Sequence, residues 1–169
     1  MYDVAIINYE MGNLYSISSA CKKAGLNSII SNKEEIIFES KSIILPGVGS
    51  FTQAMENIKE KKLDKIIIDF FNTKKPILGI CLGMQLFFDR SEELEGSNGL
   101  GLIKGEVISN GKNFYNKDKE ELNIGWNSIS FNKKNNLLRN CKNPSQMYFI
   151  HSYFCEPNDK EIITSVSKI

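Results

Sequence analysis

The chain has 169 residues, of which 41% are hydrophobic and 24% are charged, a composition typical of one globular domain with room for a core. Its 21 lysines and arginines balance 20 acidic residues, which excludes the strong positive field of proteins that bind nucleic acid or anionic membranes. The apolar runs are short and the amino-terminal residues lack the pattern of a signal peptide, so we expect a cytoplasmic protein with no membrane and no nucleic acid among its partners.

Short apolar runs alternate with helical runs over the first half of the chain. Residues 4–8 are a predicted strand, and residues 13–23 are a predicted helix that ends at Gly25, a residue suited to a helix C-cap. The elements expected next are a strand at 28–31, a weak helix at 33–38, a strand at 43–45 and one long or two short helices over 51–72. This alternation predicts an α/β fold with a doubly wound, mostly parallel sheet and flanking helices.

Residues 79–83, Gly-Ile-Cys-Leu-Gly, lie between an apolar run at 76–78 and a helical run at 84–88. A cysteine between two glycines at a strand-to-helix junction predicts a nucleophile elbow, the cysteine form of G-x-S-x-G. The glycines allow a strained turn that exposes the Cys81 thiol, and the N–H groups of the helix that follows favour a thiolate. The alternative is that Cys81 is a buried small hydrophobe, as most free cysteines are.

A second glycine-rich corner, residues 46–51, follows the predicted strand at 42–45 and precedes another helix. Ligands of open parallel sheets gather at the carboxyl ends of the strands, so the elbow and this second corner predict one site. The remaining cysteines have no Cys-x-x-Cys or metal-like spacing, so we predict free thiols and no metal site; they are Cys21, Cys141 and Cys155.

The chain changes character after Asp89, where glycines become frequent and helical periods stop. The β-type runs expected there are 103–108, 124–131, 147–154 and 162–166. Because no helical period separates them, we expect an added antiparallel region packed at one side of the parallel sheet. No repeat or linker is evident, so residues 1–169 are predicted to be a single domain.

Taken together, these motifs resemble the class I glutamine amidotransferases, specifically the glutaminase subunit of imidazole glycerol phosphate synthase. The matching segments follow the family order over nearly the whole chain and are 11–14, 46–51, the elbow with Met84 and Gln85, 125–127 and 149–153. The resemblance implies a flavodoxin-like sheet, glutamine as substrate and no cofactor. It also implies a heterodimer with a (β/α)₈ barrel cyclase, which takes the ammonia to make imidazole glycerol phosphate in histidine biosynthesis.

The chemistry expected of a glutaminase assigns roles to the two corners. Cys81 is the expected nucleophile, because a thiolate divides hydrolysis of a carboxamide into two acyl transfers through a glutamyl thioester. Elbow geometry places the backbone N–H of Leu82 to stabilise the oxyanion. The resemblance implies a second donor in the second corner, the amide of Val48. It also implies that Gly47 and Gly49 bind the substrate, by letting a peptide plane approach it or turn toward it.

Other residues are expected to bind the amino-acid end of glutamine. Gln85 lies one helical turn beyond Cys81 and can share its face. The resemblance also nominates Glu93 and the backbone at Ser152 and Tyr153 for the ammonium and carboxylate groups. The alternatives are a surface glutamine and an acidic solvated loop, and for Glu93 and Ser152 the binding role and the structural role both stay open.

The chain departs from the family pattern in its general base. The family takes a histidine and a glutamate from a His-Pro-Glu segment, whereas the one histidine here, His151, lies on a β-run and is expected to be structural. The chain ends at Ile169 in another β-like run. We therefore expect a truncated sequence whose missing part carries the triad histidine and glutamate, and weak glutaminase activity for these 169 residues alone.

A second departure concerns the partner. Leu122 and Asn123 stand where the family has Pro and His before Gly-Trp-Asn, the segment that faces the partner. Trp126 and Asn127 are candidate docking residues, although a lone tryptophan is as often part of the core. The alternative functions are a paralogue that feeds ammonia to a sugar-modifying enzyme and a non-catalytic interaction subunit.

Overall fold

The computed structural model describes residues 1–94, 96–110, 122–131 and 137–167. The chain divides into two compact units, Met1–Ile103 and Lys104–Ile169. None of the helices within the described ranges is both long enough and apolar enough to cross a bilayer.

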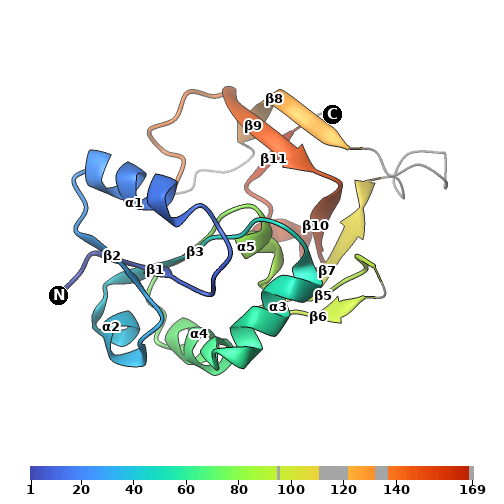
Figure 1. Ribbon diagram of the computed structural model, residues 1–169. Helices are drawn as coiled ribbons and strands as arrows, with labels where there is room; N and C mark the ends of the chain where they lie inside the picture. Colours follow the sequence, from blue (N-terminus) through green and yellow to red (C-terminus); the bar gives the residue numbers. More distant parts are fainter. Residues whose placement is uncertain (95, 111–121, 132–136, 168–169) are drawn as a thin grey trace. The chain divides into compact units, whose positions relative to one another are not determined.

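The first unit is built on a parallel sheet of four strands in the order β2–β1–β3–β4 (Figure 1). The strands are β1 (Val4–Ile7), β2 (Ser28–Ser31), β3 (Ser42–Leu45) and β4 (Ile77–Gly79). All four residues of β1 are buried, as expected for a central strand covered on both faces. This strand order is that of flavodoxin-like sheets, so the predicted doubly wound class is confirmed.

Five helices connect the strands and cover the sheet. They are α1 (Leu14–Lys23), α2 (Glu34–Glu39), α3 (Phe51–Glu60), α4 (Leu63–Asn72) and α5 (Leu82–Gln85). Figure 1 shows α1 on one face of the sheet and α2 with α4 on the other. The predicted helical stretch at 51–72 divides at Lys62, whose backbone is left-handed with φ 57°.

The predicted helix at 84–88 is wrong in its second half. Helix α5 ends at Gln85, and the chain continues into the hairpin of β5 (Phe88–Ser91) and β6 (Ser97–Asn98). The carbonyl of Leu86 accepts from Leu100 N–H at 2.9 Å, and that of Phe87 accepts from Ile103 N–H at 2.9 Å. These long-range partners replace the bonds that a longer helix would form.

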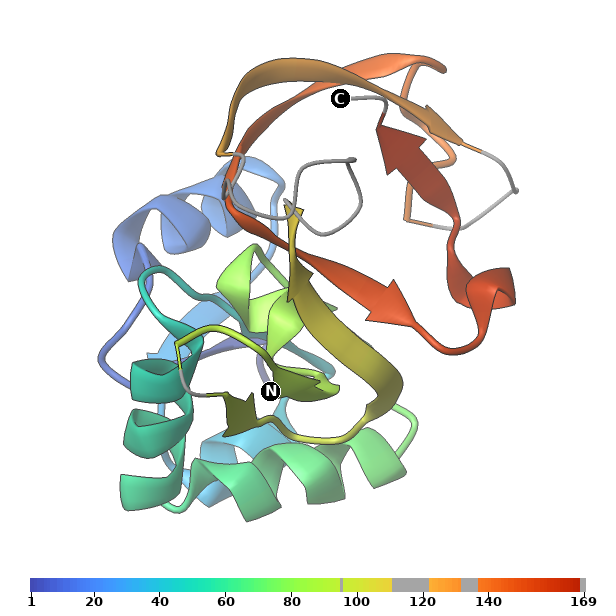
Figure 2. The same ribbon diagram turned by 90° about the vertical axis from the view of Figure 1, so that its right-hand side faces the viewer.

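The described strands of the second unit pair antiparallel, as predicted (Figure 2). They are β7 (Ile103–Ser109), which begins at the last residue of the first unit, β8 (Asn123–Phe131), β9 (Ser145–His151), β10 (Tyr153–Pro157) and β11 (Ser165–Ser167). The predicted single run at 147–154 is two strands, because β9 pairs with β8 whereas β10 pairs with β7. The predicted strand at 162–166 begins only at Ser165, after a 3₁₀ turn at Lys160–Ile162.

Candidate active site

Cys81 connects β4 to α5 in a strained backbone conformation. Its φ is 54° and its ψ is −120°, a combination that residues with a Cβ rarely adopt. The thiol is exposed, whereas Leu82 and Gly83 behind it are buried. The predicted elbow is therefore present, and an outlier of this kind at an exposed cysteine supports a functional role.

The two glycines of the elbow permit close approach of neighbouring chain segments. A Cβ at Gly83 would lie 1.9 Å from the carbonyl oxygen of Leu45, and one at Gly79 would lie 2.5 Å from the Cα of Met84. Neither glycine has a positive φ. The strained backbone therefore belongs to Cys81 itself, while the glycines let the elbow lie directly against β3 and α5.

The second corner touches the elbow through backbone atoms. Ile80 N–H donates to the Leu45 carbonyl at 3.0 Å. A Cβ at Gly47 would lie 2.5 Å from the nitrogen of Gly83 and 2.7 Å from the Cβ of Leu82. The structure thus brings together the two strand ends that the sequence analysis expects to form one site.

The candidate oxyanion donors lie on these touching segments. Leu82 is the first residue of α5, so its N–H has no acceptor within the helix. Val48 is 53% exposed beside Gly49, whose φ of 88° turns the chain toward α3. Gln85 is half-buried one turn beyond Cys81, with its backbone nitrogen 3.3 Å from the Cys81 carbonyl oxygen.

Tyr9 is a residue of this region that the sequence analysis missed. It lies two residues after β1, is fully buried, and its hydroxyl donates to the carbonyl of Pro46 in the second corner at 2.6 Å. Burial raises the pKa of the Tyr9 phenol, and the charge of nearby Cys81 raises it further, so the phenol remains a neutral donor. Its position after a central strand was the available signal, because β1 and β3 are neighbours in the sheet.

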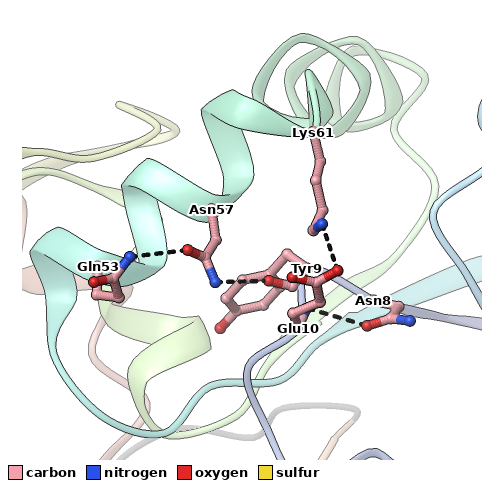
Figure 3. Close-up of polar contacts among 6 residues, drawn as sticks. All are labelled: Asn8, Tyr9, Glu10, Gln53, Asn57 and Lys61. Carbon is pink, nitrogen blue, oxygen red and sulfur yellow. Dashed lines mark hydrogen bonds and ion pairs between the residues drawn. The ribbon is translucent and has the colours of Figure 1, made fainter.

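A chain of polar contacts holds Tyr9 and the residue after it against α3 (Figure 3). Asn57 donates from Nδ2 to the Tyr9 carbonyl at 3.1 Å and accepts at Oδ1 from Gln53 at 3.0 Å. Lys61 pairs with Glu10 at 2.7 Å. Glu10 has a positive φ of 69°, so the chain turns sharply at the end of β1.

Glu93 has a structural partner beside the second corner. Its Oε2 accepts from the N–H of Phe51, the first residue of α3, at 2.7 Å. A carboxylate at this position satisfies an amide that the helix leaves unpaired. The structure thus adds a capping role to Glu93, while Oε1 remains a second acceptor on the same carboxylate.

The second unit fixes the segment that contains Ser152 and Tyr153. Asn110 N–H donates to the Ser152 carbonyl at 2.8 Å.

His151 Nδ1 lies 3.0 Å from the Tyr153 carbonyl, and Nε2 lies 3.0 Å from Nδ2 of Asn123. These partners suit a neutral ring that donates from Nδ1 and accepts at Nε2. Burial lowers the pKa of His151, and its bond to Tyr153 opposes that shift only in part. His151 is therefore a structural hydrogen-bonding residue, as predicted.

The other candidate features of the described chain have simpler surroundings. Cys21 is buried and Cys141 is exposed in a turn, and no group of three His, Cys, Asp or Glu side chains within the described residues could hold a metal ion. Trp126 is 70% exposed on β8 and meets Tyr148 of β9 edge-on, with ring centroids 5.6 Å apart. Within its unit, the tryptophan is therefore a surface residue.

Comparison with known proteins gives one consistent family. The model of the class-I glutamine amidotransferases matches residues 5–168. The imidazole glycerol phosphate synthase subunit HisH of Geobacillus kaustophilus is 39% identical over 166 residues, which cover 98% of this chain and 78% of that subunit. HisH of Bacillus subtilis is 41% identical over 154 residues, covering 90% and 72%.

Solved structures show the same fold at lower identity. A crystal structure of a glutamine amidotransferase superimposes with a TM-score of 0.69 at 15% identity, over 94% of this chain and 76% of that one. The structure of PurLQS from Thermotoga maritima gives a TM-score of 0.68 at 16% identity, over 99% and 75%. These likenesses concern the fold alone.

Proposed function

Because the chain belongs to the class I glutamine amidotransferases, and within them to the HisH subunits of imidazole glycerol phosphate synthase, we propose that Cys81 is the nucleophile with which it releases ammonia from glutamine. The family membership makes the chain a glutamine-hydrolysing subunit of histidine biosynthesis. The observation that carries the assignment of the nucleophile is the exposed Cys81 with its positive φ of 54°, in an elbow whose neighbouring residues Ile80 and Gly83 lie against the end of β3.

The proposed reaction proceeds in two acyl transfers. The Cys81 thiolate attacks the side-chain carboxamide carbon of glutamine, forming a C–S bond while the carbonyl electron pair moves onto oxygen. Collapse of this tetrahedral species breaks the C–N bond, and the nitrogen leaves as ammonia after taking a proton. Water then attacks the thioester, which releases glutamate and regenerates the thiol. We assign no proton transfer to His151, because both of its ring nitrogens have partners in the second unit.

The backbone of the two corners is proposed to stabilise the oxyanion. The N–H of Leu82 follows the nucleophile at the start of α5, and the amide of Val48 is the second donor, between Gly47 and Gly49. Preorganised donors act most strongly on charge that develops in the transition state, and losing one lowers the rate by about 10²- to 10³-fold.

Four further residues are proposed to recognise the substrate. Gln85 lies half-buried on the first turn after Cys81, and Glu93 is tied to the start of α3 beside the second corner. A carboxylate is suited to the α-ammonium group of glutamine. The resemblance to the family extends the proposal to the backbone of Ser152 and Tyr153 for the α-carboxylate.

We also propose a (β/α)₈ barrel cyclase as the heterodimer partner that receives the ammonia, in the cytoplasm. The exposed Trp126 and its neighbour Asn127 are the proposed docking residues on β8. Large exposed aromatic side chains are frequent anchors of protein interfaces. The HisH relatives support this proposal, because their names describe them as subunits of imidazole glycerol phosphate synthase.

The test uses the protein expressed from its own gene and purified together with the cyclase subunit of the same organism. It compares the effects of replacing two different cysteines. We expect Cys81→Ser to lower ammonia release from glutamine by at least about 10³-fold. Cys141→Ser, which changes another exposed thiol, is the matched control and should leave the rate unchanged. Ammonium salts should still support the cyclase with Cys81→Ser. Glutaminase activity retained by that variant would contradict the assignment.

A further inference from the structure

We propose that Tyr9 is a positioning residue for glutamine hydrolysis, because its phenol holds the Pro46–Gly47 peptide and thereby fixes the second corner against the elbow. The proposal rests on the proposed role of residues 47–49 in stabilising the oxyanion. It adds a side chain from the end of β1 to a site otherwise made by the ends of β3 and β4.

The hydrogen bond from Tyr9 is short and buried. Its hydroxyl lies 2.6 Å from the Pro46 carbonyl oxygen, at the short end of the range for O–H donors, and the side chain is fully buried. In a low-dielectric interior such a bond is electrostatically stronger than in water. Loss of the hydroxyl would leave a buried carbonyl without this donor, which favours rearrangement of the peptide.

The peptide held by Tyr9 has its other side against the elbow. The Pro46 carbonyl and the Gly47 N–H belong to one rigid plane, so fixing the oxygen also fixes the direction of that N–H. Gly47 has no space for a Cβ, which would lie 2.5 Å from the Gly83 nitrogen. A Cβ at Gly12 would lie 2.8 Å from the Pro46 ring, so the proline is also confined. The Pro46–Gly47 peptide is thus held in place, and it sets where the chain enters the exposed Val48.

Tyr9 is itself held by the helix that follows the second corner. Asn57 of α3 donates to the Tyr9 carbonyl at 3.1 Å, and Gln53 donates to Asn57 from the preceding turn (Figure 3). Helix α3 begins at Phe51, with Ser50 as its N-cap. The corner is therefore held at both ends, by Tyr9 at Pro46 and by α3 at Ser50, and α3 also secures Tyr9.

A positioning role and a purely structural role predict different kinetics. The oxyanion exists only in the transition state and the tetrahedral species, so a displaced corner lowers kcat more than it raises KM. Alkylation of Cys81 by iodoacetamide forms no oxyanion, so its rate reports only the thiolate and its exposure. A merely structural tyrosine would change the melting temperature and leave the kcat of the folded fraction unchanged.

The experiment is Tyr9→Phe in the gene-encoded protein with its cyclase subunit, assayed well below the melting temperature. We expect kcat for glutamine to fall about tenfold, less than the loss caused by removing an oxyanion donor outright. KM should stay within about twofold, and the rate of Cys81 alkylation should be unchanged. Tyr2→Phe, two residues before β1 and at the opposite end of that strand from the corner, is the matched control and should behave as wild type.

A second variant keeps the test independent of the stability of Tyr9→Phe. Asn57→Leu leaves the phenol in place and removes the amide that holds the Tyr9 carbonyl, so kcat should fall about two- to threefold in the same direction. Unchanged kcat in both variants, or equal losses of kcat and of alkylation rate, would overturn the role of Tyr9. A wild-type complex that releases no ammonia and forms no adduct at Cys81 would instead refute the proposed function.

Discussion

Replacing Gly83 with alanine would place a methyl group inside the contact between the elbow and β3. The added Cβ would lie 1.9 Å from the Leu45 carbonyl oxygen and 2.9 Å from that of Pro46. The first distance is about 1.5 Å shorter than the 3.4 Å at which ordinary contact begins. Both obstacles are backbone atoms, which cannot move aside as a flexible side chain can.

The magnitude follows from what must shift to admit the methyl group. Overpacking a filled interior costs about 1–3 kcal/mol, and the clash at Gly83 is severe enough to expect the upper end. Moving the Leu45 carbonyl also weakens the bond that it accepts from Ile80, which is worth about 1 kcal/mol. We therefore expect a loss of about 3 kcal/mol, which lowers the melting temperature of a chain of this size by about 6–12 °C.

Thermal unfolding of Gly83→Ala and Gly25→Ala tests this expectation. Gly25 has a positive φ of 76° and no atom within 4 Å of an added Cβ, so its replacement introduces backbone strain without a clash. That strain lowers the free energy of unfolding by about 1 kcal/mol, which lowers the melting temperature by about 2–4 °C. If Gly83→Ala melts no lower than Gly25→Ala, the close backbone contact at Gly83 does not limit stability.

Three further predictions concern side chains. Glu93→Gln keeps an oxygen for Phe51 N–H but loses its charge, so steady-state kinetics should show KM for glutamine raised about tenfold with the melting temperature preserved. The fold holds the pKa of His151 below its ordinary 6.5, so the unfolded chain takes the proton first. Stability should therefore be full above about pH 6.5 and fall below it, and in urea unfolding from pH 5 to 8 His151→Gln should remove that slope. Trp126→Ala, on the exposed face of β8, should weaken cyclase binding by about tenfold in calorimetric titrations while changing stability by less than about 0.5 kcal/mol.

Each of these predictions has a result that contradicts it. A lower melting temperature with unchanged KM would make Glu93 a capping residue only. Parallel stability curves for wild type and His151→Gln would show that the ring does not couple folding to pH. Unchanged affinity for the cyclase would remove Trp126 from the proposed docking surface.

The parallel half of the fold was predictable because its signals are local. Gly25 adopts a positive φ of 76° after α1, and its N–H bonds to the Lys22 carbonyl, as a C-cap residue does. Ser50 caps α3 by accepting from the N–H of Gln53 at 3.3 Å. Such turn and cap residues mark the ends of elements without knowledge of the rest of the chain.

The errors arose where distant segments compete for backbone groups. Phe88 continues an apolar run that fits a helix, yet its carbonyl accepts from Gly101 N–H at 3.1 Å in a segment that no local period reveals. Residues 147–154 form one β-type run in the sequence, but the chain changes partner at Ser152. The periodicity of hydrophobic residues indicates which side chains are suited to burial, but it does not indicate which strand they will pair with.

The candidate site likewise contains one residue that local sequence identifies and one that it does not. Cys81 was identifiable because its flanking glycines mark the corner, although the positive φ falls on the cysteine and not on them. Tyr9 carries no such mark, because an aromatic residue after a buried strand is usually a core residue. Its role depends on the 2.6 Å bond to Pro46, a residue 37 positions away in sequence.

The backbone angles of Cys81, φ 54° and ψ −120°, lie near the mirror image of the β region, which glycine occupies at little cost. A residue with a Cβ held in such a conformation lowers stability by about 1–3 kcal/mol. A lineage that no longer needed the sulfur would therefore become more stable by mutation to glycine at this position. The cysteine therefore lowers stability relative to glycine at this position and supplies a thiol that glycine lacks.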